Sequence, residues 1–206
     1  MPVIVVANPK GGVGKSTLSS NIAGYFARQG HAVMLGDVDR QQSSRLWLKL
    51  RPANLPVIQS WDITEDHMAR PPKGTTHIVL DTPAGLHGKG LEAVMKLADK
   101  VIVPLQASVF DIYATQDFLA DLAQNKRSDK LQLGVVGNRI KDHTKATEHL
   151  KEFLQTLDIP LVTLLRDTQN YAHLAAHGLS LWDVAATKVE KDLDQWAPLT
   201  AWLAAN

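Results

Sequence analysis

The sequence predicts an α/β fold in which a mostly parallel, twisted sheet is covered by helices on both faces. Two observations support this. Short apolar runs rich in β-branched residues alternate with segments whose apolar residues recur at helical spacing. The runs are also apolar throughout, which is typical of strands buried on both faces of a parallel sheet. Strand, helix, strand, helix is therefore the expected order.

The six expected strands span residues 3–7, 32–35, 77–80, 101–105, 131–136 and 161–165. Helical stripes follow the first strand at Leu18, Ile22 and Phe26, and precede the last at Leu150, Phe153, Leu154 and Leu157. Residues 50–75 contain two proline-rich turns and are expected to be the least regular part of the sheet region.

Length and composition favour one globular domain over residues 1–206. Hydrophobic residues make up 45% and charged residues 21%, which excludes disordered and fibrous classes. The absence of cysteine excludes disulfide scaffolds and thiolate metal sites. With no signal-peptide pattern and no membrane-spanning apolar run, a cytoplasmic protein is expected. A net charge of +1 means that any nucleic-acid contact must come from a local patch.

The segment "NPKGGVGKST", residues 8–17, follows the first strand directly. A glycine-rich turn between a buried strand and a helix presents backbone N–H groups to phosphate oxygens. Gly14, Lys15 and Ser16 end a phosphate-loop pattern, so Lys15 is placed to reach the β and γ phosphates and Ser16 to ligate Mg²⁺. The nucleotide-binding residues predicted here are Gly11, Gly12, Val13, Gly14, Lys15, Ser16 and Thr17.

With Pro9 where the strict pattern has glycine, and Lys10 ahead of two glycines, the loop resembles the deviant Walker A motif, KGGxGK[ST], of the ParA/MinD family of ATPases. The resemblance implies a phosphate-loop NTPase fold, ATP and Mg²⁺ as cofactors, and ATP-dependent homodimers. It also implies that Lys10 crosses to the partner subunit's nucleotide, where it offsets the repulsion between two polyphosphates. Lys10 as a solvated loop residue is the alternative.

The segment "LGDVDRQQSS" resembles the DxDPQ switch segment of the same family and supplies Asp37 and Asp39. The resemblance implies that Asp37 contributes to the magnesium shell and that Asp39 orients the attacking water, which makes Lys10, Lys15 and Asp39 the catalytic set. Either aspartate could instead cap the helix that begins near Ser43. Arg40 stands where the family usually has proline.

Two later strand ends complete the predicted site. "HIVLDTPAG" has the Walker B arrangement, so Asp81 would join Ser16 and Asp37 in holding the metal, with Gly85 as a backbone donor near the γ phosphate. "GVVGNRI" resembles the place where the family has an asparagine against adenine, which implies that role for Asn138. A turn asparagine is the alternative, and Arg139 either stacks on the base or faces solvent.

The C-terminal third offers a DNA-binding interpretation. The resemblance implies sequence-independent DNA binding by Arg166, and Lys188 and Lys191 could extend a basic face together with Lys141, Lys145 and Lys151. A solvated helix surface is the alternative. The last segment places Trp196, Leu199, Trp202 and Leu203 on one helical face without nearby lysine or arginine, which favours docking on the core over lying on a membrane.

The resemblance therefore implies a partition or positioning ATPase. Its ATP-bound dimer holds nonspecific DNA, and a ParB-like or other adaptor stimulates hydrolysis and release, so the protein is nucleoid-associated while ATP is bound. The cargo is a plasmid, a chromosome region or another assembly. Because the loop begins at residue 8, a preceding DNA-reading domain is not expected. A MinD-type membrane-associated regulator and a metabolic or metallochaperone phosphate-loop enzyme are the alternatives.

Overall fold

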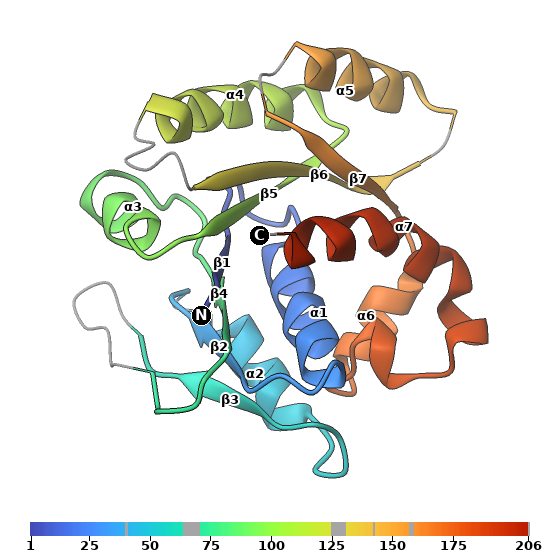
Figure 1. Ribbon diagram of the computed structural model, residues 1–206. Helices are drawn as coiled ribbons and strands as arrows, with labels where there is room; N and C mark the ends of the chain where they lie inside the picture. Colours follow the sequence, from blue (N-terminus) through green and yellow to red (C-terminus); the bar gives the residue numbers. More distant parts are fainter. Residues whose placement is uncertain (40, 64–70, 125–130, 142, 157–158, 206) are drawn as a thin grey trace.

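The structure is a computed structural model that describes residues 1–39, 41–63, 71–124, 131–141, 143–156 and 159–205. Across these residues the strands form one sheet in the order β3-β2-β4-β1-β5-β6-β7, in which every neighbouring pair is parallel (Figure 1). The strands are β1 (Val3–Val6), β2 (Val33–Asp37), β3 (Ile58–Trp61), β4 (His77–Asp81), β5 (Lys100–Gln106), β6 (Gln132–Ile140) and β7 (Leu161–Arg166).

A helix follows each strand as the sequence predicts, except that no helix is described between β3 and β4, and three helical segments follow β7. The helices are α1 (Lys15–Arg28), α2 (Ser43–Leu50), α3 (Gly88–Met95), α4 (Val109–Gln124), α5 (Lys145–Gln155), α6 (Gln169–Ala175), the short 3₁₀ helix η1 (Leu181–Asp183) and α7 (Ala186–Ala204). Leu150 and Leu154 are buried on α5 as predicted, whereas Leu157 lies outside the described residues.

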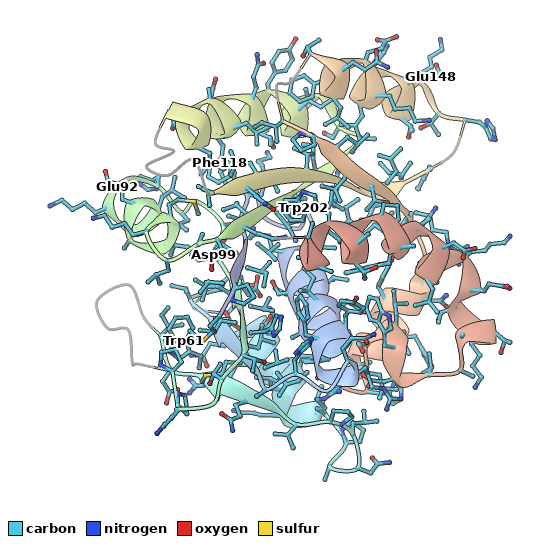
Figure 2. All side chains as sticks on the ribbon, in the orientation of Figure 1. Trp61, Glu92, Asp99, Phe118, Glu148 and Trp202 are labelled. Carbon is cyan, nitrogen blue, oxygen red and sulfur yellow. The ribbon has the colours of Figure 1, made fainter. Side chains whose placement is uncertain are left out.

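Each face of the sheet has its own apolar core, so the expectation of helices on both faces is confirmed. Alternate residues of β1 show the division: Val3 and Val5 belong to the core with α3, α4 and α5, and Ile4 and Val6 to the core with α1, α2, α6 and α7. Figure 2 shows Phe118 pointing from α4 toward the sheet, while Glu92 and Glu148 point away from it. Because all neighbouring strands are parallel, the residues that follow the strands lie at one common edge of the sheet.

The prediction for residues 50–75 missed an element. The structure forms β3 inside this segment, paired with β2 at the edge of the sheet. Only Ile58 and Trp61 of its four residues are buried, one in the core on each face of the sheet, whereas Gln59 and Ser60 are exposed. Gln59 and Ser60 between them removed the continuous apolar run that identified the other strands.

Candidate nucleotide site

A cleft of about 870 Å³ opens at the edge of the sheet where β1, β2 and β4 end. The lining comes from the glycine-rich loop and the first turn of α1, from the segments after β2 and β4, and from Arg139 near the end of β6. In parallel α/β sheets ligands bind outside the carboxyl ends of the strands, where strand order reverses. The lining includes Gly11, Gly12, Gly14, Lys15, Ser16, Thr17, Asp39, Gln41, Pro83, Gly85, His87 and Arg139.

The Asn138 side chain holds the end of the phosphate loop. Its side-chain amide donates to the Val13 carbonyl at 2.7 Å and is buried. Gly14 precedes α1 with φ +99°, and a Cβ atom there would lie 2.1 Å from Asn138 Nδ2. Only glycine satisfies both the positive φ and this close approach. The loop therefore packs tightly against the end of β6, and a role for Asn138 in supporting it escaped the sequence analysis.

Lys15 is buried at the bottom of the cleft, with its ammonium group donating to the Lys10 carbonyl at 2.7 Å. Burial lowers the pKa of Lys15, and the carboxylates of Asp81 and Asp39 act in the opposite direction. A buried cation that has one carbonyl partner and two carboxylates nearby is well placed to accept an anionic ligand. Lys15 thus occupies the place in which the sequence predicts the phosphate-binding lysine.

Asp81 ends β4 and is buried beside the first turn of α1. Ser44 of α2 donates its hydroxyl to Asp81 Oδ2 at 2.7 Å, whereas no described residue donates to the buried Oδ1. Burial raises the pKa of Asp81 to about 6, although hydrogen bonding from Ser44 and Ser16 opposes the shift. Ser44 is a site residue that the sequence analysis missed, because a hydroxyl seven residues after Asp37 carries no spacing signal.

These residues fit a magnesium ion bound mainly through phosphate. Mg²⁺ prefers oxygen ligands and usually takes only one or two from the protein, the rest being water and substrate phosphates. The unpartnered Asp81 Oδ1 and the Ser16 hydroxyl would supply those oxygens. Among the described residues no group of three or more His, Cys, Asp or Glu side chains could hold a metal alone.

Asp37 and Asp39 have different surroundings. The Asp37 carboxylate accepts the backbone N–H groups of Asp39 and Arg45, each at 3.0 Å, so it satisfies the first turn of α2. Burial raises the pKa of Asp37, and these N–H groups oppose the shift. The helix-capping alternative thus applies to Asp37, and its role toward a metal stays a prediction. Asp39 lines the cleft, and its Oδ1 accepts the Gln41 N–H at 2.9 Å. Arg40 lies outside the described residues.

The base-binding end of the site is predicted at the end of β6. Arg139, with φ +53°, lines the cleft, while the Asn138 amide nitrogen is engaged with Val13 beneath the loop. A non-glycine residue with positive φ at a cleft is uncommon and points to a functional position. Contact of Asn138 with adenine stays a prediction.

Of the predicted basic residues, Arg166 lies on β7, Lys188 and Lys191 lie on α7, and Lys141 follows β6. Arg166 ends β7 and donates through Nε to the buried Asp192 of α7 at 2.6 Å, so much of its charge is already offset. Lys188 and Lys191 are exposed on α7, and Lys141 lies 3.7 Å from Asp167. The role of these basic residues in DNA binding stays a prediction, and Lys188 and Lys191 are the most accessible of them for it.

The predicted docking of the C-terminal helix is confirmed. Trp196, Leu199 and Leu203 of α7 are buried in the core below β5, β6 and β7. Lys100, the first residue of β5, donates to the carbonyls of Trp202 at 2.7 Å and Leu203 at 3.0 Å, and also to that of Ala205. Figure 2 labels Trp202, over whose ring the Lys100 ammonium lies. Within the described part of the chain, no helix has the length and apolarity to span a bilayer.

Residues 4–181 match the family described as "CobQ/CobB/MinD/ParA nucleotide binding domain". The Maintenance of carboxysome distribution protein A of Halothiobacillus neapolitanus is 28% identical over 193 residues, which are 89% of this chain and 88% of that protein. The chromosome-partitioning ATPase Soj of Thermus thermophilus is 27% identical over 166 residues, 65% of this chain and 66% of that protein.

Solved structures share the fold across nearly the whole chain. The MinD cell division protein of Aquifex aeolicus has a TM-score of 0.76 at 18% identity and covers 100% of this chain and 98% of its own. An ATP complex of a Cyanothece McdA variant has a TM-score of 0.67 at 17% identity and covers 97% of this chain and 96% of its own. Mycobacterium smegmatis cobyrinic acid a,c-diamide synthase, with bound ADP and magnesium, has a TM-score of 0.65 at 22% identity and covers 89% and 96%.

Proposed function

The chain belongs to the CobQ/CobB/MinD/ParA nucleotide-binding family and is an ATPase of the ParA/MinD type, and from this premise we propose that it is a positioning ATPase. Its ATP-bound form dimerises and holds nonspecific DNA. An adaptor protein that carries the cargo stimulates hydrolysis and so releases the ATPase from DNA.

The observation that carries this proposal is the arrangement of charges around the phosphate loop. Lys15 lies buried at the bottom of the cleft and would pair with the β and γ phosphates. Ser16 and Asp81 would hold magnesium, whose charge offsets that of the phosphates. Asp39 lines the same cleft and would orient the attacking water.

Dimerisation is proposed from Lys10. Its backbone is fixed at both ends, because its N–H donates to the Asn8 side chain at 2.8 Å and its carbonyl accepts from Lys15. Lys10 thus lies at the start of the loop, whereas Asn138, at the predicted base-binding end of the cleft, contacts the loop at Val13. A lysine that reaches the partner's phosphates would offset the repulsion between two triphosphates that face each other.

The cargo is proposed from the relatives. The protein named for carboxysome distribution matches over most of both chains, and Soj, named for chromosome partitioning, over about two thirds of each. We favour a protein assembly as the cargo, carried on DNA bound by the exposed Lys188 and Lys191. Phosphate-loop NTPases that act alone turn over at on the order of 10⁻⁴ to 10⁻² s⁻¹, so a stimulating adaptor is part of the proposal.

The membrane-associated alternative is less well supported. A helix that binds a bilayer surface needs an apolar face free to enter it. The apolar face of α7 is instead packed on the sheet, and its last turn is held by Lys100.

The test is a DNA-binding titration with ADP, ATP and a nonhydrolysable ATP analogue at two salt concentrations. We expect binding to random-sequence duplex with ATP and the analogue but not with ADP. The logarithm of the affinity should fall with that of salt, with a slope of about 0.9 for each phosphate contact. Equal binding in all nucleotide states, or ATP-dependent binding to anionic liposomes instead of DNA, would contradict the proposal.

A further inference from the structure

His87 lines the nucleotide cleft but belongs to none of the motifs that define the site. It lies between β4 and α3 and directly precedes the first turn of α3. Its side chain is exposed, and it shares the cleft with Lys15 and Ser16 of the opposite wall. An imidazole is the side chain whose charge ordinarily changes between about pH 5 and 8, so its position next to a phosphate site has chemical consequences.

The hydrogen bonding of the ring identifies which nitrogen is left for a ligand. His87 Nδ1 lies 2.5 Å from the Gly85 carbonyl oxygen. A carbonyl oxygen only accepts, so Nδ1 carries a hydrogen, and in the neutral ring Nε2 has the lone pair. No described residue forms a hydrogen bond with Nε2. The proton that makes this imidazole cationic is therefore added at Nε2, away from Gly85.

Gly85 connects His87 to the beginning of the phosphate loop. It adopts φ +73°, and its N–H donates to the Pro9 carbonyl at 2.8 Å. The opposite end of the loop is held by Asn138 through Val13, next to the predicted base site. A nucleotide whose base lies beside Asn138 and whose phosphates follow the loop would direct its terminal phosphate toward the side held by Gly85 and His87.

We propose that His87 is a proton-dependent ligand for the terminal phosphate of ATP, an inference that rests on the ATPase function proposed above. Its Nδ1–H keeps the turn at Gly85 in place, and its protonated Nε2 donates to the γ phosphate. ADP, which lacks this phosphate, does not make the contact. ATP binding near neutral pH is consequently accompanied by proton uptake at this residue.

The surrounding charges decide how strongly His87 responds. Other elements contribute Lys15 of α1, Asp39 after β2 and Arg139 at the end of β6 to the same cleft, and α3 itself carries Lys89 and Glu92. Without nucleotide, the two cations Lys15 and Arg139 outnumber the one carboxylate, Asp39, so the cleft does not favour a positive charge on His87. A triphosphate adds several negative charges and reverses that balance, so protonation of His87 is coupled to nucleotide binding.

The experiment compares wild type with His87→Asn and the control His149→Asn. Asparagine keeps a donor near the Nδ1 position but cannot acquire charge, and His149 is exposed on α5. Calorimetry at pH 7, in two buffers of different ionisation enthalpy, measures proton uptake on binding of Mg²⁺ with AMPPNP or ADP. Wild type and the control should take up more protons with AMPPNP than His87→Asn does. With ADP the three proteins should agree.

Affinity provides a second readout. The AMPPNP affinity of His87→Asn should equal that of wild type at pH 8 and be weaker by roughly fivefold at pH 6. Comparing the proteins at each pH cancels the titration of Asp81 and of the nucleotide. A purely structural role at the start of α3 would shift affinity equally at both pH values.

Identical proton uptake and identical pH profiles in wild type and His87→Asn would overturn the inference. A wild-type protein that binds neither nucleotide would instead contradict the ATPase proposal. If His87→Asn does not fold, His87→Gln serves for the same comparison. Nuclear magnetic resonance provides a third readout. The imidazole signal that is present in wild type and absent from the variant should titrate at higher pH when AMPPNP is bound. Unchanged titration of every imidazole would overturn the inference.

Discussion

At the scale of single residues, Lys15 combines burial with few partners. Its ammonium group donates to one carbonyl and lies near two carboxylates, and burial lowers its pKa. Replacement by alanine removes the cation that we propose to bind the β and γ phosphates. We expect Lys15→Ala to lose at least about a hundredfold in ATP affinity, in line with the loss of a buried charge-assisted contact.

Fluorescent-nucleotide titration measures this effect, and Lys89→Ala, an exposed lysine of α3, is the control. Retained micromolar affinity in Lys15→Ala would show that the glycine-rich loop is not the phosphate site.

Asp81 should make the stability of the nucleotide-free protein depend on pH. Its folded pKa of about 6 lies above the ordinary value of 3.8, mainly because of burial. Folding therefore takes up a proton between these pH values, and the free energy of unfolding falls as pH rises through this window, by about 2–3 kcal/mol in the limit. Asp81→Asn removes the charge, so at pH 8 it should be more stable than wild type, and the difference should vanish near pH 4.

Urea unfolding without nucleotide or Mg²⁺ tests this, with the exposed Asp62→Asn as the control. Parallel pH profiles for wild type and Asp81→Asn would contradict the assignment. Asp37, whose pKa burial also raises, contributes in the same direction in both proteins.

At the scale of elements, the C-terminal end of α7 is held by one lysine of β5. Lys100 donates to three carbonyls there, groups that have no intrahelical partner. Lys100→Met keeps the aliphatic stem but leaves these carbonyls unpaired in a largely buried setting. We expect a loss of about 1–3 kcal/mol in the free energy of unfolding. Denaturant unfolding measures it, and Lys96→Met, an exposed lysine after α3, should change little.

The elements also show where sequence patterns succeed. All six strands predicted from continuous apolar runs are present. The strands inside the sheet are buried on both faces, which leaves few positions for polar residues, and the edge strand β7 was identified from its apolar run although it is only partly buried. β3 was missed since an edge strand needs only two buried side chains. Strand ends differ by a few residues: β5 begins at Lys100, which no apolar pattern would include, because its ammonium group is satisfied by α7.

At the scale of the whole molecule, the proposed dimer can be tested through Lys10. Lys10→Ala leaves the Lys15 contact intact, because that bond uses the backbone carbonyl. We expect ATP binding within about twofold of wild type but loss of the ATP-dependent dimer, since the variant cannot offset the repulsion between facing triphosphates. Analytical ultracentrifugation with AMPPNP measures the mass. A normal dimer with unchanged hydrolysis would remove the bridging role.

The sequence by itself determined the fold class, the phosphate loop and the placement of Lys15 and Asp81, because apolar runs and glycine spacing are local signals. Only the tertiary structure decided that Asn138 binds the loop at Val13, that Ser44 donates to Asp81 and that His87 lines the same cleft as Lys15. These contacts join residues far apart in the chain, brought to one edge of the sheet by its parallel strands, and no local spacing records which side chains meet there.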